Sequence, residues 1–107
     1  MTPKQNRMAA WANQHITFHT FNNCNNSPEE TLELLKGVPD SGRHQLGQID
    51  DHPIYGDIPY VASIFVSTTG ELTMNVIYFK DLPMTDIEAR GYSLAIFVTA
   101  FEDFPIK

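Results

Sequence analysis

Residues 60–79 read YVASIFVSTTGELTMNVIYF, and this stretch decides the fold. Apolar and polar residues alternate on both sides of STTG, as they do in two β-strands joined by a tight turn. A three-residue loop that ends at Gly70 in the left-handed conformation sets Ser67 opposite Glu71. The sequence therefore predicts a β-hairpin with a defined register.

This register gives the hairpin one apolar face. It pairs Phe65 with Thr73 and Ser63 with Asn75, and it gathers eight other side chains on the opposite side. These are Tyr60, Ala62, Ile64, Val66, Leu72, Met74, Val76 and Tyr78. A slip of one residue would invert every side chain, so we expect this face to pack on a core.

The second face of the hairpin is less polar than a solvated face needs to be. It carries Val61, Phe65, Ile77 and Phe79 among Ser63, Thr73 and Asn75. Such a mixture is typical of an interface or of a sheet that another helix partly covers. The first helix, with Trp11, could supply this cover, and a second copy of the chain is the alternative.

Two helices are predicted near the N-terminus from their capping signals. Thr2 precedes proline and is followed three residues later by glutamine, which predicts a helix over residues 3–14. Ser27 opens a second helix with proline and two acidic residues, and Gly37 ends it. The leucines of this helix expected to be buried are Leu32 and Leu35, with Leu34 left open.

A third helix is predicted over residues 86–103, beginning after Thr85. The stripe expected to lie on the hairpin is Ile87, Gly91, Leu94, Ala95, Val98 and Phe101. Tyr92 and Ile96 project from the far side, and Phe97 and Phe104 lie on a flank. This surplus of apolar residues indicates cover either by another element or by a partner.

The remaining segments are a strand and two irregular regions. Residues 15–21 are rich in β-branched and aromatic residues and predict a strand. The asparagine-rich residues 22–26 predict a loop. Residues 38–59 are interpreted as irregular, with a short edge strand over 45–49, and we expect any ligand to bind there.

Together these elements predict an α+β fold. We expect residues 1–107 to form a single domain with the element order α-β-α-(β)-β-β-α. An antiparallel sheet of three to four strands should contain the central hairpin 60–79. Two to three helices pack on the sheet, and the C-terminal helix 86–103 lies across it.

Composition narrows the class of protein. Of its 107 residues 42% are hydrophobic, a fraction typical of a folded domain, so we expect a folded chain despite the formal net charge of −6. No apolar run approaches the roughly 18 residues that cross a bilayer, and the first 15 residues lack the apolar stretch of a signal peptide. We therefore expect a cytoplasmic protein without membrane contact. Cys24 is the only cysteine, and we expect a spare thiol.

The sequence lacks the motifs that carry common chemistry. It has no GxSxG, GxxxxGK[ST], GxGxxG or HExxH pattern, and its histidines have no diagnostic spacing for a metal. We expect no catalytic residue, no metal and no cofactor. Thirteen acidic residues against seven basic ones also argue against nucleic acid as a ligand.

These observations favour a small acidic cytosolic protein-binding module. It would be an accessory or inhibitory factor of the phage or mobile-element type that docks on a host protein. The predicted contact residues are Phe65, Phe79, Tyr92, Ile96 and Phe97, with Asp50, Asp51 and Asp57 as a charged rim.

Two other functions stay open. A small-molecule-binding or enzymatic domain would use a pocket at the 38–59 segment, lined by His44, His52, Tyr55 and Asp57. A structural homo-oligomer, most simply a homodimer, would bury the second hairpin face or the last helix against its own copy.

Overall fold

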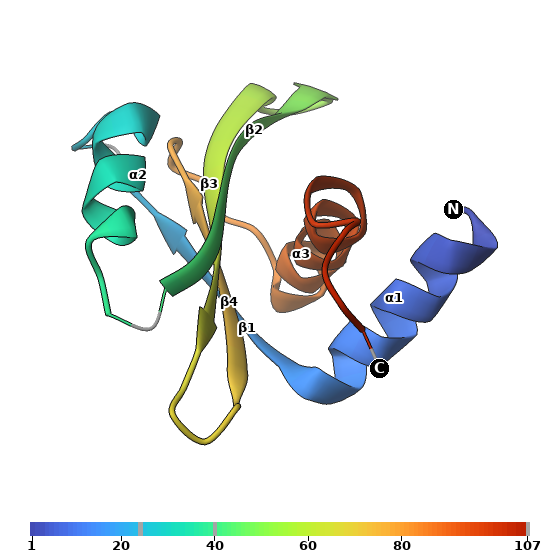
Figure 1. Ribbon diagram of the computed structural model, residues 1–107. Coiled ribbons are helices and arrows are strands. Elements are labelled where there is room, and N and C mark those ends of the chain that lie inside the picture. Colours follow the sequence, from blue (N-terminus) through green and yellow to red (C-terminus); the bar gives the residue numbers. More distant parts are fainter. Residues whose placement is uncertain (24, 40, 107) are drawn as a thin grey trace.

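The computed structural model describes residues 1–23, 25–39 and 41–106. Its elements are α1 (Pro3–His15), β1 (Ile16–Asn22), α2 (Pro28–Lys36), β2 (Ser41–His52), β3 (Gly56–Val66), β4 (Leu72–Tyr78) and α3 (Asp86–Ala100) (Figure 1). The predicted α+β class and element order are confirmed. The expectation for Cys24 concerns a residue outside the described ranges. Within those ranges, no helix has the length and apolar character needed to cross a membrane.

The strands form one mixed sheet in the order β1-β4-β3-β2. β3 is antiparallel to both β2 and β4, whereas β1 runs parallel to β4. The expectation of a wholly antiparallel sheet is therefore wrong at one pair. α2, β2 and β3 separate β1 from β4 along the chain, so no tight turn forces these two strands to run in opposite directions.

The hairpin register is confirmed. Phe65 pairs with Thr73, and the Ser67 amide donates to the Glu71 carbonyl at 2.9 Å. Gly70 has a φ of 86°, which favours glycine. The predicted apolar face packs on the core, except at the turn end, where Leu72 is half-buried and Val66 is exposed.

The segment 38–59 is not an irregular region. β2 occupies most of it, and β3 begins at Gly56 after a short turn. The predicted edge strand over 45–49 lies inside β2, which is the outer strand of the sheet on this side. Its glycines and charges lower its β-propensity, so the sequence alone gave a weak signal. The long pairing with β3, which two register shifts interrupt, stabilises β2 despite its low β-propensity.

The predicted helix caps are present. Thr2 and Ser27 each form a capping box at the start of α1 and α2, and the Thr85 hydroxyl accepts from the Glu88 amide at the start of α3. The expected burial of the α2 leucines is wrong in part. Leu32 and Leu35 are half-buried and Leu34 is exposed, whereas Thr31 is the buried residue of this helix. A short helix on a sheet buries only a narrow stripe, and here that stripe is centred on Thr31.

The helices lie on both sides of the sheet (Figure 1). α2 packs on β2 and β3 and covers the β3 half of the second hairpin face. α1 packs instead against α3 on the other side, where the rings of Trp11 and Phe97 are stacked with centroids 6.3 Å apart. The hypothesis that the first helix covers the second hairpin face is therefore wrong. α1 ends at His15 and β1 begins at Ile16, so no loop is available to carry α1 across to that face.

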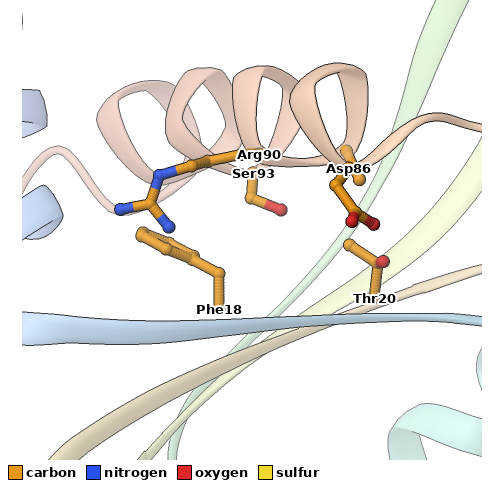
Figure 2. A pocket seen from close by; sticks show the side chains of 6 residues that line it. Phe18, Thr20, Asp86, Arg90 and Ser93 are labelled. Atoms are coloured by element: carbon orange, nitrogen blue, oxygen red, sulfur yellow. The ribbon is translucent and has the colours of Figure 1, made fainter.

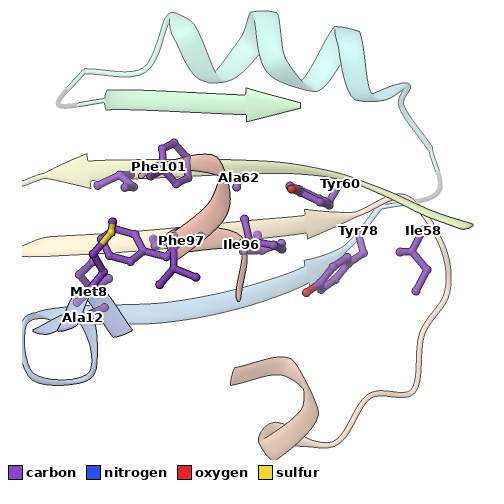
Figure 3. Close-up of a cluster of buried hydrophobic side chains, with 14 of the residues drawn as sticks. Met8, Ala12, Ile58, Tyr60, Ala62, Tyr78, Ile96, Phe97 and Phe101 are labelled. Carbon is purple, nitrogen blue, oxygen red and sulfur yellow. The ribbon is translucent and has the colours of Figure 1, made fainter. Parts of the chain in front are cut away.

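α3 lies on the sheet as predicted, but it is rotated about its axis. Ile87, expected on the sheet, is 86% exposed, and Gly91 and Ala95 are also exposed. Ile96, expected on the far side, and Phe97, expected on a flank, are only 5% and 0% exposed and belong to the core cluster (Figure 3). α3 contacts both the sheet and α1, so its buried side is set by two neighbours that lie far away in the sequence.

Candidate functional site

The predicted partner-contact residues do not form one surface. Ile96 and Phe97 are buried in the core, so they do not lie on a surface that a partner could contact in this structure. Phe65, Phe79 and Tyr92 are half-buried. Phe65 lies on the α2 side, where its ring meets the edge of the His44 ring, while Tyr92 belongs to α3 on the opposite side.

The three acidic residues of the predicted rim do lie together. Asp50, Asp51 and Asp57 are exposed at the end of the sheet where β2 turns into β3. The Asp51 amide donates to the Asp57 carboxylate at 3.1 Å, and the Gln48 side chain donates to Asp50 at 2.8 Å. These contacts shape the turn, and the rim lies on the β2 side of the sheet, remote from β1.

The alternative ligand pocket does not gather all four of its predicted residues. The ring of His52 lies 5.0 Å from that of Tyr55 and 6.1 Å from that of Tyr92, on the α3 side. Asp57 lies at the same turn. His44 is eight residues away along β2 and pairs with Ser63 on the α2 side. The structure therefore does not bring His44 together with the other three residues, because it lies farther along the continuous strand β2.

His44 has a structural role instead. Its Nδ1 lies 2.8 Å from the hydroxyl oxygen of Ser63, a fully buried residue. Burial and, to a lesser degree, the positive charge of Lys36 lower the pKa of His44. Its neutral form can therefore share a hydrogen bond with the Ser63 hydroxyl.

A more open surface lies at the other edge of the sheet, along β1. Four of the five residues from 17 to 21 are exposed: Thr17, His19, Thr20 and Phe21. α2 packs chiefly on β2 and β3, so it leaves the neighbouring part of the sheet uncovered. We call this part the open half-face, and it consists of Thr17, His19, Phe21, Thr73, Asn75 and Ile77. The sequence places Thr73, Asn75 and Ile77 on the less polar second face of the hairpin, but it does not show which half of that face α2 leaves open.

The open half-face is aromatic and uncharged. Phe21 is 52% exposed and lies in register with the half-buried Ile77. The rings of His19 and Phe21 lie 6.4 Å apart. An exposed aromatic side chain beside an apolar strand residue is a frequent feature of protein contact surfaces.

A second candidate site lies on the opposite side of β1, in a groove beneath α3 (Figure 2). Its larger part has a volume of about 230 Å³ and is lined by Phe18, Thr20, Asp86, Ala89, Arg90 and Ser93. A smaller part of about 110 Å³ continues from it past Thr20 and Asp86 toward Tyr78. We call the two parts together the β1–α3 groove.

Two buried hydroxyl groups of the β1–α3 groove have no partner. Ser93 is fully buried and Tyr78 is 1% exposed, and neither hydroxyl finds a hydrogen-bond partner among the described residues. Figure 2 shows the Ser93 hydroxyl in the space between α3 and β1. Burial raises the pKa of Tyr78 strongly, so its phenol stays protonated and can donate. Buried polar groups are normally hydrogen-bonded, so each exception calls for an explanation.

The charged residues of the groove are held apart. Arg90 donates to the side-chain oxygen of Asn13 at 2.6 and 3.1 Å, and its guanidinium lies 5.3 Å from the centre of the Phe18 ring. Asp86, one helical turn before Arg90, forms no ion pair in the described part of the chain. Figure 2 shows Ser93 between these two side chains.

Sequence analysis missed this groove, although one signal for it was present. Asp86, Arg90 and Ser93 are spaced at i, i+4 and i+7, which places them on one stripe of a helix. The prediction of which side of α3 faces the sheet followed the apolar residues instead. Among the described residues, no group of His, Cys, Asp or Glu side chains is arranged to hold a metal ion.

Comparisons with known proteins add no assignment. No protein-family model, no curated protein and no solved structure matches this chain.

Proposed function

We propose that this chain is a protein-binding module that pairs β1 with an extended segment of a basic partner protein. The observation that carries the proposal is the exposed, unprotected edge of β1 beside the open half-face. An edge strand presents unpaired backbone groups to which another strand can add.

The contrast between the two edges supports this choice of strand. β2, at one edge, has two register shifts and carries Arg43, Asp50 and Asp51, which are features that discourage strand addition. β1 pairs with β4 without a register shift over all seven of its residues. Its sequence, ITFHTFN, contains no proline, lysine or acidic residue. β1 is therefore the edge that lacks protection.

The open half-face offers exposed side chains that an added strand can contact. Side chains of a strand beside β1 would alternate between the two sides of the sheet. Those on the α2 side would reach Phe21 and His19, so an apolar residue there would cover the exposed Phe21 ring. Backbone pairing then supplies affinity, and the Phe21 contact supplies selectivity.

The net charge favours a basic partner. The chain carries a formal charge of −6, which attracts a basic segment over a long range and discourages a second copy of the chain. The open half-face itself is uncharged, so this attraction speeds association more than it strengthens the final contact. An accessory or inhibitory factor of the phage or mobile-element type could act in this way, by occupying a surface of a host protein.

The proposal is tested with peptides. A displayed library of random peptides is selected on the immobilised protein, and the affinity of the enriched peptides is measured by fluorescence anisotropy. We expect enriched peptides to be rich in Lys and Arg and in β-branched residues. Amide hydrogen exchange should slow in residues 17–21 when such a peptide binds.

Two matched variants locate the contact. Phe21→Asp and Ile54→Asp both replace an exposed apolar side chain with the same charge, and Ile54 lies at the β2–β3 turn. Phe21→Asp should weaken binding tenfold or more, which is the rough effect of losing the burial of one large apolar side chain. Ile54→Asp should leave the affinity unchanged.

Other results would overturn the proposal. Equal effects of the two variants, or slowed exchange in β2 instead of β1, would remove the β1 edge as the contact. A dimeric mass in light scattering, together with slow exchange in β1 without peptide, would replace the basic partner with a second copy.

A further inference from the structure

We propose that the β1–α3 groove binds a small zwitterion that carries both an ammonium and a carboxylate group, the chemistry of a free amino acid. This inference concerns the opposite side of β1 from the open half-face and goes beyond the protein-binding function. It stands on the cavity, its two separated charges and its two unpartnered hydroxyls.

The unpartnered hydroxyls are the first reason to expect a polar ligand. Ser93 and Tyr78 are both more than nine-tenths buried, and they line the two connected parts of the groove. Leaving a buried hydroxyl without a partner is unfavourable, and an apolar residue at either position would avoid this. A ligand with polar atoms would give both hydroxyls a partner.

The separation of charge is the second reason. Acidic and basic residues four positions apart on a helix normally attract each other. Here Arg90 turns away from Asp86 and is held by Asn13 and by the ring of Phe18. The groove therefore presents a cation toward one end and an anion toward the other, with the Ser93 hydroxyl between them (Figure 2).

Both charged groups keep capacity for a ligand. A guanidinium has five N–H donors, and two of those of Arg90 are used on Asn13, so the others remain for a carboxylate. Asp86 is exposed and has no ion pair within the described residues, so its carboxylate can accept from an ammonium group. Thr20, on β1 across from Asp86, adds an exposed hydroxyl.

The size and charge of the groove narrow the ligand class. The larger part of the groove, with a volume of about 230 Å³, has room for a small molecule and not only for a single water. A simple anion would meet the carboxylate of Asp86, and a simple cation would meet the guanidinium of Arg90. A zwitterion is the ligand that suits both charges.

The experiment is an NMR titration of the full chain with named probes. Glycine, alanine and serine are compared with straight-chain ω-amino acids, whose charges lie progressively farther apart. Propylamine and propionate serve as singly charged controls. We expect saturable amide shifts in β1 and the first half of α3 with at least one amino acid, and weaker binding of both controls.

Variants assign the roles of the side chains. Asp86→Asn and Arg90→Gln should each weaken binding on the order of tenfold or more, since each removes a charge-assisted hydrogen bond. Glu102→Gln and Arg7→Gln make the same changes at exposed positions outside the groove and should leave the affinity unchanged. Ser93→Ala should weaken binding by up to about tenfold, because it removes a neutral hydrogen bond.

The Ser93→Ala variant also separates a ligand role from a structural one. Its denaturant midpoint should stay the same or rise, because the variant removes a buried hydroxyl that has no partner. Absence of saturable shifts with every amino acid would overturn the proposal and leave ordered water as the partner of these hydroxyls. Equal binding of propylamine or propionate would also overturn it, whatever the outcome of the peptide experiment at the β1 edge.

Discussion

The side of α3 that faces the sheet can be tested by adding one methyl group, in the substitution Gly91→Ala. Gly91 lies in the middle of α3 and is exposed, and a Cβ built on it meets no atom within 4 Å. Glycine is about 0.8–1.0 kcal/mol less favourable than alanine inside a helix. Gly91→Ala should therefore raise the free energy of unfolding by about 1 kcal/mol and the Tm by roughly 4 °C.

The same substitution at Gly47 should have the opposite sign. Gly47 pairs with Tyr60 across β2 and β3, and its added Cβ would lie 2.3 Å from Cζ and Oη of the Tyr60 ring. Tyr60 is only 7% exposed, so its ring can move only by disturbing the core. Overpacking of this kind costs roughly 1–3 kcal/mol.

Urea unfolding of both variants, followed by circular dichroism, measures the two effects with one method. The result that would refute the reasoning is a loss of stability in Gly91→Ala. Gly91 would then face the sheet, as the apolar stripe in the sequence predicted, and α3 would have a different rotation. The groove would lose its basis in that case, because Ser93 would no longer face β1.

Three further predictions concern a cap and two kinds of titrating group. Thr85→Ala should lower the free energy of unfolding by about 1 kcal/mol, because the Glu88 amide loses its acceptor; an unchanged urea midpoint would contradict the cap. Burial and Lys36 lower the pKa of His44 below 6.5, so the unfolded chain binds more protons and stability should fall as the pH drops below 6.5. His44→Asn should show a smaller loss in urea titrations across this range, and an identical loss would count against the assignment. Burial raises the pKa of Tyr60 and Tyr78 above 10.0, so stability should decline as the pH rises through that value. An absorbance titration should ionise fewer tyrosines in the native than in the urea-unfolded chain, and coincident curves would rule this out.

The features that sequence analysis predicted correctly are those encoded by neighbouring residues. The hairpin follows from alternation and from Gly70, and the helix starts follow from Thr2, Ser27 and Thr85. Each of these signals acts within a few residues, so the rest of the fold is not needed to interpret it.

The features that it missed depend on neighbours far away in the chain. The periodicity of α3 allows more than one apolar stripe, and contact with α1 decides that Phe97 is buried and Ile87 is exposed. β2 has weak propensity and is held by its pairing with β3. The sequence does not say how the hairpin meets β1, so it could not predict a parallel pair or an edge at Phe21.

The candidate sites also combine local features, which the sequence shows, with contacts between distant residues, which it does not show. The spacing of Asp86, Arg90 and Ser93 was visible in the sequence and would have placed them on one side of a helix. The lack of a partner for the Ser93 hydroxyl, and the turn of Arg90 toward Asn13, depend on packing between α1, α3 and β1. No local pattern encodes these contacts.

The alternation of β1 also explains why two proposals can rest on one strand and still be tested separately. Phe18 and Thr20 lie in register with the core residues Met74 and Val76, so they face α3 and line the groove. Phe21 is offset by one residue and belongs to the open half-face, although it also borders the smaller part of the groove. Ser93→Ala therefore changes only the groove, whereas a charge at Phe21 changes the open half-face and the border of the smaller part of the groove, but not its larger part. A loss of peptide binding in both variants would mean that the two sides of β1 are coupled through the strand.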